Sequence, residues 1–206
     1  MEKVKLILSL AVITASIIGC SSSKPLAREV KASINKDFVI TKSVSGIENF
    51  TGKSTDQTYH DRVVESLTSG MTGKGITVTN DSPEYKITIE EVSIVETSIL
   101  ETINDTLAKN NGSVFKLSSV KVIVSGYVTA ATGVGKSYPF SESKEKNEST
   151  TKNRGAMQHY KGENMHSDEY REKKLSDYEV LKMIGSCAYN GGKRAAKNII
   201  KDVGTL

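Results

Sequence analysis

The chain of 206 residues lacks a long apolar run, and this absence limits how it can meet a membrane. Its main apolar run covers residues 6–18 and is interrupted only by Ser9, Thr14 and Ser16. A helix that spans a bilayer needs about 20 apolar residues, so this run is too short. Nothing after residue 20 is apolar enough to cross a membrane, and we therefore expect no transmembrane helix.

The chain also lacks the usual patterns of an enzyme or a nucleic-acid binder. It contains no compact Ser/His/Asp or Cys/His pattern, no nucleophile elbow and no zinc-ligand spacing. Its net charge of +4 is mild, and its basic residues are interspersed with acidic ones rather than clustered among aromatics. We therefore expect a protein without catalytic residues, cofactor, metal, bound nucleotide or nucleic-acid partner.

The first twenty residues have the features of a secretory signal. A basic start with Lys3 and Lys5 precedes the apolar run, and the small residue Gly19 follows it. The next residue is Cys20, and this stretch resembles the lipobox of bacterial lipoproteins. In that family the signal is removed just before the cysteine, which then carries acyl chains. The resemblance implies that residues 1–19 are a signal peptide, that cleavage falls between Gly19 and Cys20, and that Cys20 is lipidated.

The same resemblance implies a location. Ser21 follows the cysteine, as in lipoproteins of Gram-negative bacteria that are sent to the outer membrane, whereas aspartate there would suggest inner-membrane retention. We expect acyl chains on Cys20 to hold the protein on the periplasmic face of the outer membrane, with the inner membrane and the cell surface left open. A plain secretory signal is the alternative. Residues 20–29 form a short tether that reaches at most about 35 Å.

Three local features have both a structural and a chemical interpretation. With Cys20 lipidated, Cys187 is left without a disulfide partner, and we expect a small buried side chain rather than a reactive thiol. Residues 130–137 resemble a relaxed P-loop, but an extended segment follows, so we expect a turn between strands. A polar segment holds residues of types that suit copper, and we favour a solvated stretch over a metal site. These residues are Met157, His159, Met165 and His166.

Hydrophobic periodicity predicts an α+β fold for residues 30–206. Helices are expected at about 55–72, where apolar residues recur every four positions, and at 177–203, which opens with a capping-box sequence. They would cover one face of a mostly antiparallel sheet of about four to six strands. Glycines in the second helix predict close packing on the sheet or a kink. The expected strands cover residues 30–44, 76–78, 85–96, 114–128 and 138–140. The first is broken at 35–37, the third has a bulge near Glu91, and the last is an edge strand.

Residues 141–175 have many charged and few aliphatic side chains. Such a composition cannot bury much apolar surface, so we expect a mobile polar loop there. Residues 56–96 predict a helix ending in glycine, a short strand and then a long strand with glutamates at its bulge. This arrangement is similar to α/β domains of small periplasmic lipoproteins. These include penicillin-binding-protein activators and outer-membrane assembly factors.

These observations favour a non-catalytic accessory or adaptor lipoprotein in cell-envelope assembly. It would hold an envelope protein partner through a sheet edge or through residues 141–175, while acyl chains bind the membrane. The first alternative is a binding module for a small ligand such as a lipid, a glycan fragment or a metal. The second is an envelope hydrolase whose catalytic groups are far apart in the sequence.

Overall fold

The structure is a computed structural model, and it describes residues 28–46, 51–155, 158–160, 163–165 and 168–204. The expected signal peptide at residues 1–19, the cleavage site between Gly19 and Cys20 and most of the tether at 20–29 lie outside these residues. The side chains of the Met and His group at 157–166 also lie outside the description. The predictions that concern them therefore stay predictions.

Two helices form at the predicted positions, because the sequence caps both of them. α2 (Asp56–Thr72) begins after Thr55, whose side-chain oxygen accepts a hydrogen bond from the amide three residues later. α3 (Asp177–Val203) begins with a reciprocal capping box between Ser176 and Glu179. It continues through its glycines as one helix. In the described part of the chain, no helix is long and apolar enough to cross a membrane.

Six strands form one mixed sheet, which confirms the α+β class. They are β1 (Val30–Asn35), β2 (Ile40–Ser45), β3 (Ile76–Val78), β4 (Tyr85–Thr102), β5 (Val114–Ala130) and β6 (Tyr138–Asn147). The order is β3–β1–β4–β5–β6. β1 pairs with residues 85–88 of β4, and β2 pairs with residues 92–97 of the same strand. The short pairs of β1 and β2 are parallel, whereas the long pairs β4–β5 and β5–β6 are antiparallel.

Two local predictions about the sheet are also confirmed. The register of β4 against β5 shifts between Ile89 and Glu91, which is the expected bulge. β6 is an edge strand, and Pro139 lies within it opposite Tyr127. Residues 131–137 form the turn that joins β5 to β6, so no helix begins at the segment that resembles a P-loop.

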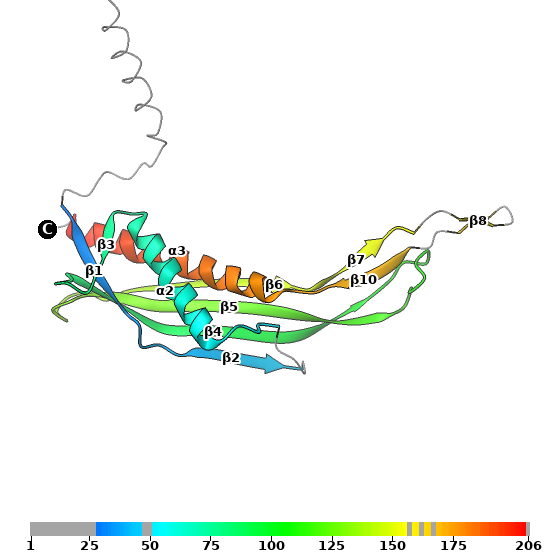
Figure 1. Ribbon diagram of the computed structural model, residues 1–206, viewed down its shortest axis with the longest axis horizontal. Helices are drawn as coiled ribbons and strands as arrows, with labels where there is room; N and C mark the ends of the chain where they lie inside the picture. The colour runs from blue at the N-terminus through cyan, green and yellow to red at the C-terminus, as the bar shows by residue number, and fades with distance from the viewer. Residues whose placement is uncertain (1–27, 47–50, 156–157, 161–162, 166–167, 205–206) are drawn as a thin grey trace, which may run out of the picture.

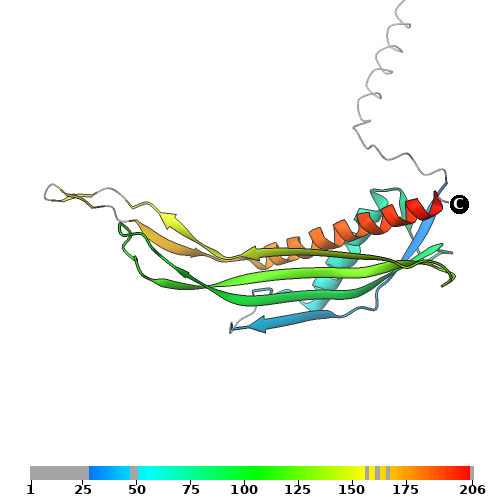
Figure 2. The same cartoon turned by 180° about the vertical axis from the view of Figure 1, so that it is seen from behind.

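α2 and α3 pack on one face of the sheet (Figures 1 and 2). The sheet contributes Val120, Val122 and Val124, none of which is exposed, because their side chains alternate toward the helices. Cys187 of α3 is also buried, as predicted, and burial raises the pKa of its thiol to about 11. This core lies between Val30 and Ile199, and α2, α3 and the sheet under them are called the body here.

The molecule is elongated, because β4 and β5 continue beyond the helices (Figure 1). The described part of residues 141–175 is mostly strand rather than the expected loop. β6 leads into β7 (Ser149–Asn153), which pairs with β10 (Glu169–Lys173) over five residues. Between them, β8 (Gln158–Tyr160) pairs with β9 (Glu163–Met165). The prediction failed because these strands are joined by main-chain bonds and polar side chains rather than by an apolar face. We call residues 97–119, 148–155 and 168–175 the arm.

Candidate functional site

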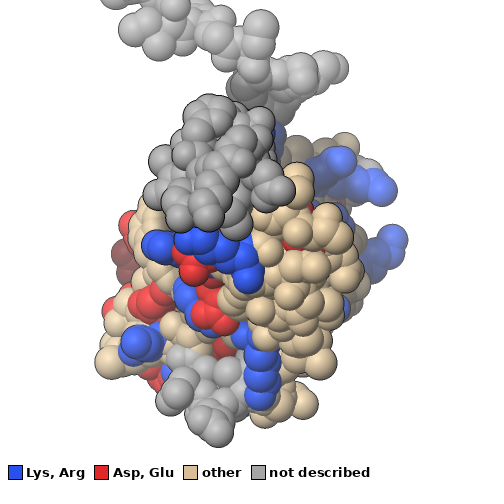
Figure 3. Space-filling model, turned by 90° about the vertical axis from the view of Figure 1, so that its right-hand side faces the viewer, with Lys and Arg blue, Asp and Glu red and all other residues tan. Residues whose placement is uncertain are grey.

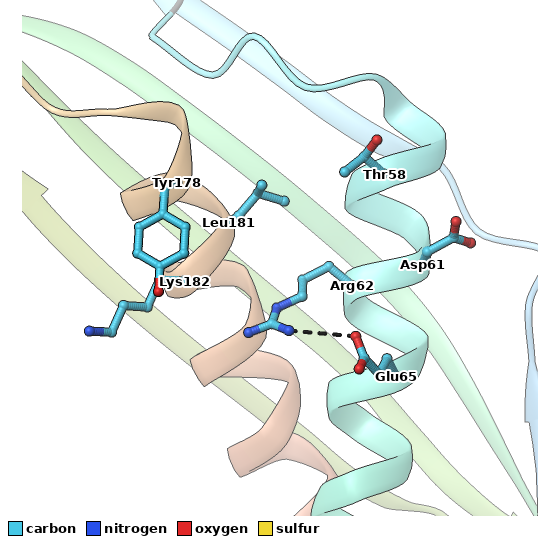
Figure 4. A pocket seen from close by; sticks show the side chains of 7 residues that line it. All are labelled: Thr58, Asp61, Arg62, Glu65, Tyr178, Leu181 and Lys182. Atoms are coloured by element: carbon cyan, nitrogen blue, oxygen red, sulfur yellow. Dashed lines mark hydrogen bonds and ion pairs between the residues drawn. The ribbon is translucent and has the colours of Figure 1, made fainter.

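A groove between α2 and α3 results from glycine contacts where the helices meet. A Cβ atom at Gly192 would lie 2.2 Å from the Leu67 carbonyl oxygen, and one at Gly70 would lie 2.2 Å from the Tyr189 carbonyl oxygen. The two backbones therefore touch at this point, as small residues allow. This confirms close packing at the glycines of α3, although Gly192 packs on α2 rather than on the sheet. Toward the beginnings of both helices, the groove opens between them (Figure 4).

The groove has two parts, with volumes of about 540 Å³ and about 420 Å³. Both parts are lined by Arg62, Glu65 and Lys182, so they form one continuous depression. The first part is also lined by Thr58, Asp61, Tyr178 and Leu181, and the second by Ser66, Ser69, Gly185, Ser186 and Tyr189. The lining therefore combines charges of both signs with one apolar and two aromatic side chains.

Arg62 reaches across the groove from α2 toward α3 (Figure 4). Its guanidinium lies against Gly185, where a Cβ atom would be 2.6 Å from the Arg62 Nε. Its ion pair with Glu65, one turn along α2, is long at 3.5 Å, and both side chains are solvent-exposed, so the pair contributes little to stability. The guanidinium can therefore exchange this partner for a carboxylate of a ligand at small cost.

A second candidate surface is the arm, whose root is fixed by a buried carboxylate. Glu148 is 5% exposed and lies where β6 ends and β7 begins. Its two side-chain oxygens accept hydrogen bonds from the Ser118 amide at 2.9 Å and from the Leu175 amide at 3.0 Å. Lys174 Nζ lies 3.6 Å away. One side chain thereby joins β5, the start of β7 and the segment before α3.

The tip of the arm is fixed by a polar network between its two strand pairs. Lys152 Nζ lies 2.8 Å from an Asp105 oxygen and 3.0 Å from an Asp168 oxygen, and these contacts raise the pKa of Lys152. The hydrogen bond from Lys152 holds the pKa of Asp105 below its ordinary value. Tyr170 donates its hydroxyl to Asp105 at 3.1 Å and its amide to Asn110 at 3.1 Å. We call these five residues the tip network.

Three large apolar side chains are exposed on the arm: Leu100 at 74%, Leu107 at 63% and Val114 at 59%. Leu100 and Val114 lie on the same face of the β4–β5 ribbon, because Thr102 pairs with Val114 and residues two apart share a face. Figure 3 faces the arm end and shows acidic and basic side chains mixed there. The arm thus offers isolated apolar groups on a surface without one dominant charge.

The buried carboxylates of the body have structural roles. Glu96 is fully buried and accepts hydrogen bonds from the amide and the hydroxyl of Thr51, at 2.8 and 2.6 Å. Asp177 accepts from Ser54 and from the Tyr59 hydroxyl. Burial alone would raise the pKa of Asp177, but these hydrogen bonds hold it below its ordinary value. Both carboxylates therefore fasten the segment before α2 to the body.

Cys187 and the turn at 131–137, which the sequence singled out, line neither part of the groove. His60 of α2 stacks on Phe38 with ring centroids 4.3 Å apart, and its Nε2 lies 2.7 Å from the Lys36 carbonyl oxygen, so it packs against the β1–β2 connection. Among the residues that the structure describes, no group of three or more His, Cys, Asp or Glu side chains is placed to hold a metal ion.

The residues of the groove were not predicted from the sequence, and of the arm only the segment 141–175 was named, as a mobile loop that could hold a partner. The groove residues have ordinary surface spacing on two helices, and only the glycines of α3 indicated that another backbone comes close. In the arm, the β-branched pair Thr150 and Thr151 and the aromatic Tyr170 are strand-forming types that the high charge of the segment obscured.

Comparison with known proteins places this chain in no family. No protein-family model matches it, and no curated protein does. Similar solved structures include a homolog of the neuraminyllactose-binding hemagglutinin from Helicobacter pylori, at 11% identity and a TM-score of 0.42, covering 89% of each chain. A minor lipoprotein from Acinetobacter baumannii is 11% identical, with a TM-score of 0.31, and the match covers 85% of this chain and 92% of that one.

The PelC dodecamer from Paraburkholderia phytofirmans is also similar, at 7% identity and a TM-score of 0.28, over 84% of this chain and 94% of that one. At TM-scores below 0.5, however, no argument about the site or its ligand rests on these similarities.

Proposed function

We propose that this protein is a lipid-anchored accessory protein of the bacterial cell envelope, which binds another envelope protein through its arm and catalyses no reaction. Acyl chains on Cys20 hold it on the periplasmic face of the outer membrane. The arm then presents a fixed binding surface away from that membrane.

The observation that carries this proposal is the position of the two ends of the molecule. β1 begins and α3 ends at one end of the molecule, and the arm lies at the other (Figures 1 and 2). Cys20 precedes Arg28 by eight residues, which span at most about 28 Å. β4 alone has 18 residues, or about 60 Å at 3.3 Å per residue. An anchor on Cys20 therefore holds one end of the molecule near the membrane and leaves the arm free to reach away from it.

The arm is suited to binding because its conformation is set before a partner arrives. Glu148 fixes its root and the tip network fixes its end, so little conformational entropy is lost on binding. Leu100 and Val114 expose apolar surface on one of its faces. Burying these side chains against a partner removes apolar surface from water, which favours binding.

A non-catalytic role is supported by how the reactive groups are used. Glu148 and Glu96 accept hydrogen bonds from backbone amides, and Asp177 accepts hydrogen bonds from amides and from a tyrosine hydroxyl. Cys187 is buried, and its raised pKa keeps the thiol protonated at neutral pH. These groups are occupied in holding the fold rather than directed toward a cleft.

Site-specific photo-crosslinking in cells tests the proposal. A photoreactive side chain at Val114 should capture one envelope protein, whereas the same group at Val134, 80% exposed at the opposite end, should not. Mass spectrometry of the mature chain should show an acylated Cys20, and Cys20→Ala should release the protein from the membrane fraction. Capture at Val134 alone, no capture at either position, or an unmodified Cys20 would contradict the proposal.

The groove between α2 and α3 supports a second candidate, a module that binds a small carboxylate-bearing ligand. Arg62 would bind the carboxylate, while Leu181 and Tyr178 contact its apolar part. Native mass spectrometry of the protein purified from its host should then show a bound mass that Arg62→Gln loses and that Lys116→Gln, a charge removal on the arm, retains. Equal loading of both variants, or no bound mass, would reject this candidate.

A further inference from the structure

The second half of α3 carries a basic stripe beside β6. Arg194, Lys197 and Lys201 follow one another at intervals of three and four residues, so they lie on one face of the helix, and all three are exposed. Three of the residues between them, Ala195, Ala196 and Ile199, are buried in the core. The amphipathic pattern of α3 thereby turns its basic residues outward as one row.

This row borders a depression of about 590 Å³. The depression is lined by Pro139, Arg194, Lys197, Asn198, Ile200 and Lys201. Three of these six residues are cationic and none is acidic, while Pro139 and Ile200 provide apolar surface. We call this depression the basic groove. Its lining fits an anionic group that is attached to an apolar one.

The carboxylates next to the basic groove already have partners within the protein. Glu142 of β6 forms an ion pair with Arg194, which holds the guanidinium at the rim. Asp202 accepts hydrogen bonds from the hydroxyls of Tyr85, at 2.8 Å, and Tyr138. Glu142 therefore lies against Arg194 at one end of the row, and Asp202 is held toward β4 and β6 by the two tyrosines.

The basic groove lies at the anchored end of the molecule. Figures 1 and 2 both show the end of α3 beside the start of β1, opposite the arm. Arg28, which forms an ion pair with Glu84 at 2.6 Å, fixes the point where the chain enters the fold there. Since Cys20 is eight residues from Arg28, lipidation would bring this end within about 28 Å of the membrane.

We propose that the basic groove binds the anionic headgroups of phospholipids in the membrane that carries the anchor. This inference rests on the proposed function in that it takes the membrane to lie at the Cys20 end. Each Lys or Arg near an anionic membrane surface contributes about 1 kcal/mol of binding free energy, and such a patch adds a second signal to acyl chains. When this end lies on the membrane, the arm points away from the membrane in one fixed orientation.

Vesicle co-sedimentation of the chain from Ser21 to Leu206 tests the proposal without the anchor. This chain keeps the whole core, which lies between Val30 and Ile199. We expect it to bind vesicles of phosphatidylcholine and phosphatidylglycerol, and not vesicles of phosphatidylcholine alone. Lys197→Gln with Lys201→Gln should weaken binding about thirtyfold, since two basic residues contribute about 2 kcal/mol.

The matched control removes two exposed lysines of the arm, with Lys109→Gln and Lys116→Gln, and should bind as the unmodified chain does. Circular dichroism checks that both variants fold. Equal weakening in the two variants, equal binding to both kinds of vesicle, or no binding would overturn the proposal. Because these samples lack Cys20, the result is independent of whether Cys20 is acylated, which the mass spectrometry of the mature chain decides separately.

Discussion

The body and the arm hold their strands together by different means. In the body, β4 and β5 bury valine and isoleucine side chains under two helices, and several of these are not exposed at all. In the arm, few apolar side chains are buried, among them Ile103 and Leu117, and carboxylates accept backbone amides instead. The body therefore depends on apolar burial and close packing, whereas the arm depends on a few polar contacts. The arm can consequently be loosened while the body stays folded.

Gly192→Ala should produce the largest loss, because it acts on the packing of the body. A Cβ atom there would lie 2.2 Å from the Leu67 carbonyl oxygen, so the helices must separate. Helix propensity alone predicts a gain of about 1 kcal/mol. A clash with main chain this close costs more than ordinary overpacking, about 3–4 kcal/mol, so the net loss in the free energy of unfolding is about 2–3 kcal/mol. Urea denaturation measures the free energy of unfolding. Lys197→Ala, exposed on the same helix, is the control, and an equal effect of the two substitutions would show that the glycine contact is not needed.

Glu148→Ala should cause the next largest loss in the free energy of unfolding, because it removes the carboxylate at the root of the arm. The amides of Ser118 and Leu175 then lose their acceptor, and a buried unpaired polar group costs about 1–3 kcal/mol. We expect a loss of about 2 kcal/mol in the free energy of unfolding and faster hydrogen exchange at these two amides. Glu148→Gln keeps one acceptor oxygen and should lose less. If alanine and glutamine had the same effect, the two hydrogen bonds would not be what fixes the root.

The sequence predicted the body far better than the arm. The reason is that the body depends on apolar burial, whereas the arm depends on polar contacts. The start of each helix follows from a local cap at Thr55 or Ser176, and the bulge near Glu91 follows from a change of phase in one strand. Apolar periodicity reports burial, so it reveals elements whose stability comes from burial. The boundaries of α3 were predicted to the residue for this reason.

The strands of the arm were not predicted because polar side chains join them, so the sequence shows no apolar periodicity there. Lys152 and Asp168 are sixteen positions apart and Asp105 is far from both, so nothing local indicates that their charges meet. The groove between α2 and α3 was missed for a related reason. Arg62 and Gly185 come together only because the helices cross elsewhere, and crossing geometry depends on tertiary packing.

Lys152→Met should have a smaller global effect that is confined to the arm. The lysine is partly exposed, so its two ion pairs contribute little to the free energy of unfolding. We expect faster hydrogen exchange at the amide of Lys109, which donates to the Asp168 carbonyl oxygen at 2.9 Å, and no change at Val122 in the body. Lys116→Met, elsewhere on the arm, should leave both amides unchanged. Acceleration at Val122 would show that arm and body unfold as one unit.

Asp105→Asn gives the smallest effect, which appears only as a dependence on pH. The hydrogen bond from Lys152 holds the pKa of Asp105 below its ordinary value of about 3.9, so the folded arm favours the ionised carboxylate. This contribution is present above the pKa of the unfolded chain and is lost as the pH falls through the lower pKa of the folded arm. Protection of the Lys109 amide, corrected for the intrinsic exchange rate, should therefore fall in acid.

In Asp105→Asn, protection of the Lys109 amide should be lower at neutral pH, because Lys152 keeps only its ion pair with Asp168. Protection should also change less in acid, because an amide side chain at position 105 carries no charge to lose. If the variant and the unmodified protein lost protection equally over the same pH interval, the charge of Asp105 would not hold the arm together. The main-chain and amide hydrogen bonds between Asn110 and Tyr170 would then be what joins its two strand pairs, and the arm would hold its strands through neutral hydrogen bonds rather than through charge.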